Sequence, residues 1–247
     1  MIQLKSQREI AAIRKASEIV ALTLRKLSNS VKAGITTLEL DAMAAALIEK
    51  SGGRSAFKGY RGYPANICTS INEEVVHGIP SNRALKDGDI ISIDVGVEID
   101  GYFGDGAVTV GVGKISKDAA NIVSVTEKAL MEGIKAAYPG NRIFDISNSI
   151  QRFVEEAGYT VVRAFVGHGI GSKIHEEPEI PNFGRPGTGP KIEQGMVLAI
   201  EPMVNAGTYE VEVAADGWTA ITKDKMISAH FEHTVLINNS QAEVLTK

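Results

Sequence analysis

Two acidic residues, Asp94 and Asp105, lie in a mostly β-branched, apolar stretch over residues 88–108. The dipeptide Asp100-Gly101 accepts the positive φ angles of a tight hairpin turn, so we predict antiparallel strands over about 89–99 and 102–112. This turn brings Asp105 back roughly opposite the middle of the first strand. Two carboxylates facing each other in an apolar hairpin repel, and they either share a proton or hold a metal ion. The alternative is that both point to solvent at a sheet edge.

The second half of the chain repeats this pattern of acids and adds a histidine to it. Three features recur in the same order in both halves: His77 and His168 before Gly-Ile, Asp94 and Glu201 six positions after a glycine, and Asp105 and Glu232 at the start of a β-branched run. The spacings differ between the halves, which indicates a divergent duplication with insertions and not a short-period repeat. Two halves related by a pseudo-twofold axis would bring the four carboxylates into one central site.

The charge of these four carboxylates favours two metal ions over one. A single divalent cation would leave two negative charges in a partly dry cavity, whereas two cations would neutralise the set and also bind a hydroxide. Carboxylate ligands with one imidazole suit Mn, Fe, Co or Zn. Two ions about 3.5–4 Å apart would lower the pKa of a bridging water and polarise a carbonyl, which is metal-assisted hydrolysis.

Other catalytic patterns are weak or lacking in the sequence. The glycines around His168, over residues 167–171, permit close backbone approach, but the final glycine of the dinucleotide-binding fingerprint is missing. No phosphate-binding P-loop, nucleophile-elbow serine or His-Glu-x-x-His zinc motif occurs. We expect Cys68 to pack in the interior and not to act as a nucleophile, and His233 to be structural.

The overall composition is that of an ordinary globular protein. The 247 residues are 44% hydrophobic and 23% charged, with a net charge of −4 and a pI near 5.8, which argue against nucleic-acid binding. The single cysteine excludes an internal disulfide and fits a reducing cytoplasm. No apolar run approaches the about 18 residues of a membrane span, and the first residues lack the apolar core of a signal peptide.

The order of predicted elements indicates one domain of class α+β with an antiparallel sheet core flanked by helices. Helix caps and periodicity predict helices over about 6–29, 36–51, 116–138 and 143–157. Apolar runs predict strands over about 67–70, 75–76, 160–166, 195–204, 209–214, 218–222 and 228–237, with loops over 54–65 and 178–190. Because no low-complexity linker separates them, we expect a single catalytic domain made of two related halves, about 1–112 and 113–247.

Several motifs together carry a resemblance to a known family. They are Gly-Tyr-Arg-Gly-Tyr-Pro (59–64), Ser-Ile-Asn-Glu (70–73), Val-His-Gly-Ile-Pro (76–80), Ile-Asp-Val-Gly (93–96), Gly-His-Gly-Ile-Gly (167–171), His-Glu-Glu-Pro (175–178), Ile-Glu-Pro-Met-Val-Asn-Ala-Gly (200–207), Asp-Gly-Trp (216–218) and Phe-Glu-His-Thr (231–234). In their order and spacing the chain resembles the bacterial type I methionine aminopeptidases over nearly its whole length. The short gap from Glu201 to Glu232 leaves no room for the helical insertion of type II enzymes, and the zinc-binding extension of eukaryotic type I enzymes is lacking. The resemblance implies the pseudo-twofold pita-bread (creatinase/aminopeptidase) fold.

The resemblance also implies a role for each site residue. Asp105 and Glu232 would bridge two metal ions, Asp94 would bind one of them, and His168 with Glu201 the other. His77 would contact the scissile amide nitrogen or the substrate backbone, and His175 would stabilise the developing oxyanion. Glu201 would also shuttle a proton to the leaving amine, and Asp94 would lie near the free α-amine. The residues matching the methionine side-chain pocket are Tyr60, Tyr63, Cys68 and Trp218, with Phe57 at its wall.

Three positions depart from the family's usual residues. Phe57 replaces a frequent cysteine and Ile174 a frequent phenylalanine, and both changes are expected at the pocket wall. His230 often corresponds to glutamine. It is either an additional polar neighbour of the metals or a surface residue.

The implied activity is metal-dependent removal of the N-terminal initiator methionine from nascent proteins when the second residue is small, with a metal-bridging hydroxide attacking the carbonyl. The expected cofactors are two divalent ions (Co, Mn, Fe or Zn). The expected setting is a cytoplasmic monomer acting on nascent polypeptide N-termini near the ribosome, with no nucleic-acid specificity and no membrane association. An X-Pro aminopeptidase or prolidase on the same fold is an alternative, although those chains usually carry a further N-terminal domain. A non-catalytic binding protein is another, although such relatives lose metal ligands and all five are present here.

Overall fold

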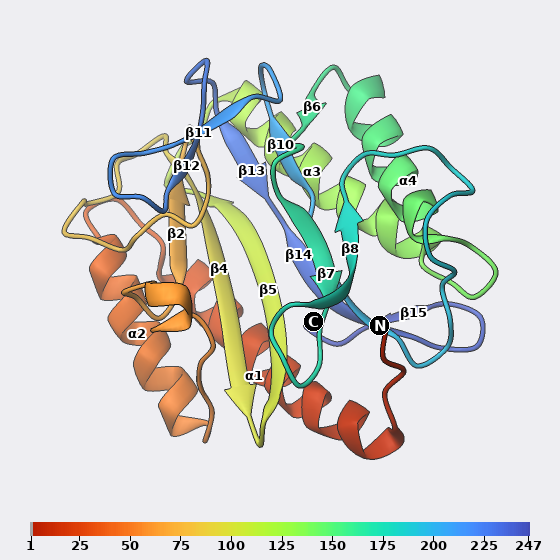
Figure 1. The fold of residues 1–247 in the computed structure, drawn as a ribbon. Helices are drawn as coiled ribbons and strands as arrows, with labels where there is room; N and C mark the ends of the chain where they lie inside the picture. The colour runs from red at the N-terminus through yellow and green to blue at the C-terminus, as the bar shows by residue number, and fades with distance from the viewer. Residues whose placement is uncertain (1) are drawn as a thin grey trace.

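A curved antiparallel sheet forms the centre of the molecule in the computed structural model, which describes residues 2–247 (Figure 1). Along its main path the strands follow the order β1, β4, β5, β14, β9, β7 and β8. Their bounds are β1 Arg54–Ser55, β4 Ile90–Ile99, β5 Tyr102–Gly111, β7 Val166–Gly169, β8 Glu176–Pro181, β9 Val197–Ile200 and β14 Glu232–Ile237. Two further strands, β2 (Cys68–Ile71) and β15 (Ala242–Val244), pair with β4 and β14.

The predicted hairpin over residues 89–112 is confirmed as β4 and β5. Asp100 and Gly101 form its turn with φ angles of 53° and 80°, the left-handed values that an Asp-Gly turn accepts. In this register Asp105 pairs with Gly96 and Asp94 pairs with Ala107. The two carboxylates therefore lie diagonally across neighbouring strands, near the middle of β4.

The two halves of the chain meet in the middle of the sheet. The hairpin β4–β5 comes from the first half and the antiparallel pair β14–β9 from the second, and Glu232 at the start of β14 pairs with Ala107 of β5. Outward from this junction, β5 with Asp105 is followed by β4 with Asp94 on one side. On the other side β14, which begins at Glu232, is followed by β9, which ends directly before Glu201. This mirrored order is the arrangement expected of a pseudo-twofold fold.

Among residues 2–247, four long helices cover the sheet in two pairs (Figure 1). They are α1 Gln7–Ser30, α2 Thr37–Lys50, α3 Lys117–Ala136 and α4 Ile143–Glu156, in agreement with the predicted helices. Capping boxes at Ser6 and Thr36 begin the first two, as their sequences predict. The buried faces of α1 and α2 pack on β2 and β4, and those of α3 and α4 pack on β9 and β14, so each half has its own apolar core.

Two small sheets complete the fold and correct part of the prediction. They follow the orders β13–β10–β6 and β11–β12–β3, from β3 Glu74–Val76, β6 Thr160–Val161, β10 Met203–Asn205, β11 Val211–Val213, β12 Ala220–Thr222 and β13 Ser228–His230. The predicted single strands over 160–166, 195–204 and 228–237 are each divided. In each case the two pieces join different sheets, because the chain bends between them, for example at Pro202.

The predicted loop over residues 178–190 is wrong at its beginning. Residues Glu176–Pro181 form β8, an edge strand that pairs only with β7 on the main path of the sheet described for residues 2–247. Proline is tolerated at such an edge because its missing N–H can face away from the neighbouring strand. Strand β15 was not predicted.

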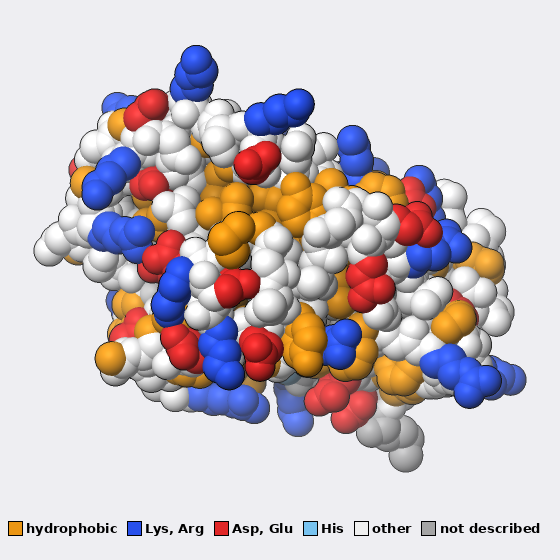
Figure 2. Space-filling model, turned by 90° about the horizontal axis from the view of Figure 1, so that it is seen from above, with side chains coloured by type: hydrophobic (Ala, Val, Ile, Leu, Met, Phe, Trp, Pro, Cys, Tyr) orange, Lys and Arg blue, Asp and Glu red, His pale blue; other side chains and the backbone are white. Residues whose placement is uncertain are grey.

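The face seen from above in Figure 2 carries a band of hydrophobic side chains bordered by acidic and basic side chains. Charges of both signs are interspersed on this face, with no continuous basic surface (Figure 2). Among the described residues, no helix is both long enough and apolar enough to cross a membrane.

Candidate active site

A cavity of about 650 Å³ lies over the junction of the two halves. It is lined by the residues to which the family resemblance assigns metal binding, catalysis or a place in the methionine pocket: Phe57, Tyr60, Tyr63, Cys68, His77, Asp94, Asp105, His168, His175, Glu201, Trp218 and Glu232. These residues come from both halves of the chain and from strands and loops far apart in sequence. The fold therefore brings the whole predicted set together.

The four acids are withdrawn from solvent. Asp94 is 8% exposed, Asp105 4% and Glu232 2%, while Glu201 is half-buried. The alternative that the hairpin acids point to solvent is therefore wrong. One carboxylate oxygen of Asp94 (Oδ1) and one of Glu232 (Oε1) are buried without a hydrogen-bond partner in the described part of the chain. Buried, unpartnered carboxylate oxygens are costly unless a cation satisfies them.

Burial and mutual repulsion shift the ionisation of these acids. Removal from water raises the pKa of Asp94 to about 7 from an ordinary 3.8. Burial, followed by repulsion from neighbouring carboxylates, raises the pKa values of Asp105, Glu201 and Glu232 well above the usual range. A divalent cation would reverse this shift, because it favours the ionised form.

His168 completes the group from strand β7. Its Nδ1–H donates to the carbonyl of Gly169 at 2.9 Å, which leaves Nε2 directed at the acids, 3.5 Å from Glu201 Oε1 and 4.0 Å from Asp105 Oδ2. Burial lowers the pKa of His168 to about 4, so the ring is neutral at pH 7. A neutral imidazole whose other nitrogen is held by a carbonyl is a typical metal ligand.

The donor atoms fit a divalent metal ion. One ligand atom each of Asp105, His168 and Glu232 lie within 4.8 Å of one another. The set consists of carboxylate oxygens and one imidazole nitrogen in a buried position, which suits a first-row divalent ion. The unpartnered oxygens of Asp94 and Glu232 supply further ligand atoms beside this group.

His77 lies on a segment that strains its backbone. Its φ angle is 63°, a left-handed value that a non-glycine residue adopts only when the surroundings impose it. The ring is half-buried and packs edge-on against Phe165, with the ring centroids 5.3 Å apart. Burial lowers the pKa of His77, so the neutral ring is favoured.

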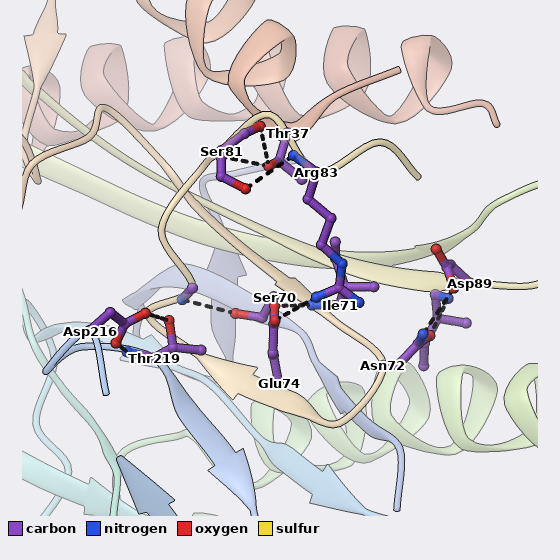
Figure 3. Close-up of polar contacts among 12 residues, drawn as sticks. Thr37, Ser70, Ile71, Asn72, Glu74, Ser81, Arg83, Asp89, Asp216 and Thr219 are labelled. Atoms are coloured by element: carbon purple, nitrogen blue, oxygen red, sulfur yellow. Dashed lines mark hydrogen bonds and ion pairs between the residues drawn. The ribbon is translucent and has the colours of Figure 1, made fainter. Parts of the chain in front are cut away.

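Polar contacts on either side of His77 hold this segment in place (Figure 3). Glu74 accepts from Ile71 N at 2.7 Å and from Arg83 Nη1 at 2.8 Å. Ser81 N donates to Thr37 Oγ1 at 2.8 Å, which ties the segment to the first turn of α2. The strained position is therefore fixed from both ends, as a preorganised site requires.

A second polar turn, in which Asp216 and Thr219 are bonded to each other (Figure 3), positions Trp218. Asp216 Oδ1 accepts from the backbone N–H groups of Trp218 and Thr219, each at 2.9 Å, and Asp216 Oδ2 accepts from Thr219 Oγ1. The Trp218 ring meets Tyr63 edge-on with centroids 5.1 Å apart. These two aromatic side chains form an apolar wall of the cavity.

His175 lies on the loop that precedes β8, is exposed, and lines the cavity. Its Nδ1 and the Tyr60 hydroxyl form a hydrogen bond of 3.0 Å, and its ring centroid is 4.4 Å from that of His168. The surrounding protein and then the nearby His168 and Arg61 lower the pKa of His175 to about 3. The neutral ring can donate one hydrogen bond to a substrate oxygen.

The remaining pocket residues form an apolar recess beside Asp94. Cys68 pairs with Asp94 across β2 and β4 and is 4% exposed. Burial and the charge of Asp94 raise the pKa of the Cys68 thiol well above its usual value, so the thiolate needed for nucleophilic attack is disfavoured. Phe57 lies directly over Gly96, where a Cβ atom would be 2.5 Å from its ring.

Two of the departures from the family pattern are clarified. Ile174 is 3% exposed and is not among the residues that line the cavity, so its expected place at the pocket wall is wrong. His230 is 1% exposed, which excludes the surface interpretation. Its Nε2 is 3.7 Å from Glu201 Oε2, and neither ring nitrogen has a hydrogen-bond partner among residues 2–247.

The sequence missed several residues of the cavity wall. They are Gln3, Arg61, Val76, Val166, Ser172, Lys173, Glu176, Glu177 and Glu179. Arg61 and Glu176 lie inside motifs that carry the family resemblance, and this was the only signal that could have found them. Gln3 precedes the first helix and has no local signal.

Comparison with known proteins places the chain in a family. Residues 11–239 match the model of metallopeptidase family M24. The methionine aminopeptidase of Clostridium perfringens is 53% identical over 246 residues, covering 100% of this chain and 99% of that protein. Methionine aminopeptidase 1 of Bacillus subtilis is 50% identical over 247 residues, covering 100% of both.

Solved structures give the same result. The methionine aminopeptidase of Thermotoga maritima matches with a TM-score of 0.99 and 46% identity over 100% of both chains. The prolidase of Pyrococcus furiosus matches with a TM-score of 0.81 and 25% identity, covering 99% of this chain and 65% of that one. The predicted pita-bread fold is confirmed by these neighbours.

Proposed function

The chain belongs to metallopeptidase family M24, and we propose that it is a metal-dependent methionine aminopeptidase that removes the initiator methionine from proteins whose second residue is small. The observation that carries the proposal is one cavity in which a buried carboxylate–imidazole group adjoins a recess of aromatic and sulfur-containing side chains. Relatives about half identical to this chain over its full length are methionine aminopeptidases.

We infer that Asp94, Asp105, His168, Glu201 and Glu232 hold two divalent ions, of Co, Mn, Fe or Zn. Their unpartnered buried oxygens and raised pKa values support this assignment. When bound, the ions supply a Lewis acid that polarises the scissile carbonyl and activates water for its attack.

The side chains around the ions supply binding and proton transfer. The recess of Phe57, Tyr63, Cys68 and Trp218 takes the methionine side chain, whose flexible thioether suits soft aromatic surroundings. Tyr60 lies at its edge and orients His175 through their hydrogen bond.

Two neutral histidines act on the peptide bond. His175 donates to the oxygen that develops negative charge, a contact that strengthens in the transition state. His77 contacts the scissile amide nitrogen or the substrate backbone. Glu201 carries a proton to the leaving amine, which its raised pKa favours.

The wider setting follows from the substrate. We infer that the chain is one catalytic unit of two related halves, about 1–112 and 113–247, that acts as a monomer on nascent polypeptide N-termini in the cytoplasm near the ribosome. Its single cysteine is free and buried, as a reducing compartment permits.

The test is release of methionine from Met-Gly-Met-Met by chelator-stripped protein, with and without added Mn²⁺ or Co²⁺. Metal-restored release, absent in an Asp105→Asn variant, supports the proposal. Cleavage of an X-Pro dipeptide in its place would favour the prolidase alternative, which the similarity to the Pyrococcus furiosus prolidase keeps open. Tight metal uptake without turnover of either peptide would indicate a binding protein.

A further inference from the structure

We propose that Lys5 is a positioning residue for the active site: through Glu176 it holds the loop 171–176, and with it His175, at the mouth of the cavity. The role given to His175 rests on the proposed function. Lys5 itself touches none of the reacting groups and precedes the first helix, 171 residues from its partner.

The ion pair between Lys5 and Glu176 is withdrawn from solvent. Lys5 Nζ lies 2.5 Å from Glu176 Oε2, and the two side chains are 3% and 9% exposed. The ammonium also donates to the Gln3 carbonyl at 3.1 Å. Pairs on the surface contribute little, but removing one partner of a buried pair leaves an uncompensated charge, so the remaining partner moves toward water.

Glu176 uses its second carboxylate oxygen to fix the conformation of the loop. Its second oxygen, Oε1, accepts from the backbone N–H of Lys173 at 3.1 Å and from Ser172 Oγ at 3.3 Å. One carboxylate thus closes the loop on itself and binds it to the N-terminal segment. His175 is the residue directly before Glu176, so its position follows that of the carboxylate.

His175 itself is in contact with Tyr60 and His168 through its ring. Its side chain is exposed at the cavity mouth, and its hydrogen bond is to the Tyr60 hydroxyl. Tyr60 belongs to a short 3-10 turn over Tyr60–Gly62, and its ring centroid is 5.3 Å from that of His175. Backbone contacts hold the two ends of the loop, namely the bond from Phe103 N to the Gly171 carbonyl and the pairing of Gly169 with Glu176 between β7 and β8. Between these ends, the Glu176 carboxylate and the Tyr60 hydroxyl hold residues 172–175.

The chain is shaped to let Lys5 reach the loop. A Cβ atom at Gly171 would lie 2.4 Å from Lys5 Cε, so any other residue there would collide with the lysine side chain. The Lys5 backbone N–H donates to the Gly195 carbonyl at 2.8 Å, and the next residue, Ser6, caps α1. The close approach of Lys5 therefore explains why glycine occupies position 171, the last glycine of the Gly-His-Gly-Ile-Gly motif.

The pair also forms part of the cavity wall. Gln3 and Glu176 both line the cavity, and Lys5 bonds to both. The pair Arg14–Glu243 provides a contrast, because its side chains are 39% and 33% exposed and neither residue lines the cavity. The Lys5–Glu176 pair thus differs from Arg14–Glu243 both in its burial and in its link to His175.

The test compares Lys5→Met, which keeps an unbranched chain and removes the charge, with Glu176→Gln and the double variant. A misplaced oxyanion donor weakens the transition state more than the bound substrate, so we expect kcat for Met-Gly-Met-Met to fall about 10- to 100-fold with KM within about twofold. The double variant should be no worse than the worse single variant, because both remove the same restraint. Arg14→Met is the matched control and should leave kcat and KM unchanged.

A second measurement separates positioning from general destabilisation. Hydrogen exchange in metal-loaded Lys5→Met should rise in residues 172–177 and stay as in the wild type in α2. The proposal would be overturned if both kcat and hydrogen exchange in the loop stayed unchanged. It would also be overturned if hydrogen exchange rose throughout the molecule and kcat and KM changed by similar factors. If Lys5→Met fails to fold, the same kinetic and hydrogen-exchange measurements are made on Glu176→Gln, which keeps a neutral amide in place of the carboxylate. If the wild type releases no methionine, the proposed function fails, and the exchange comparison still decides whether Lys5 fixes the loop.

Discussion

Replacing Asp94 with asparagine should stabilise the metal-free protein and at the same time weaken its binding of divalent metal. Asp94 is buried among three other acids, and burial raises its pKa to about 7 in the folded state. In the unfolded chain the carboxyl has an ordinary pKa near 3.8. Below that pH the group is protonated in both states. As the pH rises from about 4 to 7, the folded state retains a proton that the unfolded state has lost, and stability falls.

The size of this effect follows from the shift. A rise from 3.8 to about 7 corresponds to about 4 kcal/mol at roughly 1.4 kcal/mol per unit. Asp105, Glu201 and Glu232 also have raised pKa values, so the proton is shared and Asp94 alone contributes part of this energy. We expect the free energy of unfolding of the metal-free variant to exceed that of the metal-free wild type by about 1–3 kcal/mol at pH 8, and by less at pH 4.5.

Urea unfolding of chelator-stripped protein at pH 4.5 and pH 8 measures this difference. Adding Mn²⁺ at pH 8 should then reverse the order, because the wild type binds the ion more tightly than the variant does. The matched control is Asp41→Asn, at a buried aspartate that accepts hydrogen bonds from Asn66 N, Asn66 Nδ2 and Ile67 N, and it should destabilise the protein at both pH values. A metal-free Asp94→Asn protein that is less stable than the wild type at pH 8 would refute the reasoning.

Three shorter predictions concern the pocket. Gly96→Ala should lower the free energy of unfolding by about 1–3 kcal/mol and raise KM, because its Cβ would meet the Phe57 ring at 2.5 Å. Adding Phe57→Cys should restore both quantities, which urea unfolding and peptide kinetics measure. His230→Leu should stabilise the metal-free protein by about 1 kcal/mol in calorimetry, since it removes a buried imidazole without hydrogen-bond partners in the described chain; a destabilised variant would contradict this. Cys68 should resist iodoacetamide at pH 8 until urea unfolds the chain, because burial raises the pKa of its thiol, and rapid labelling of the folded protein would show the assignment of burial to be wrong.

Local sequence predicted the elements whose signals are local. The Asp100-Gly101 turn fixed the register of β4 and β5, and hence the diagonal placement of Asp94 and Asp105. The capping boxes at Ser6 and Thr36 fixed the starts of α1 and α2. The internal parallel between the acids predicted that they would meet, and all four line one cavity.

Features that depend on distant parts of the chain were not predictable. The sequence predicts a loop where β8 forms, because the prolines of an edge strand resemble those of a loop until the neighbouring strand is known. The predicted strand over 195–204 is interrupted at Pro202 because its two pieces, β9 and β10, pair with strands of different sheets. The burial of His230 depends on its pairing with Met203 in a small sheet. The contact of Lys5 with Glu176 has no local signal at all.

The arrangement of the acids couples folding to metal binding. Each half contributes strands whose burial stabilises the fold and acids whose burial destabilises it, and the acids meet where the two halves join. Without metal, their raised pKa values represent free energy that the apolar cores of both halves must offset. An ion that binds the ionised carboxylates would remove this penalty only when both halves are in place, because the proposed ligands come from both. Metal binding should therefore stabilise the junction of the halves more than either helix pair, and protection from hydrogen exchange on adding Mn²⁺ should be greatest in β5 and β14.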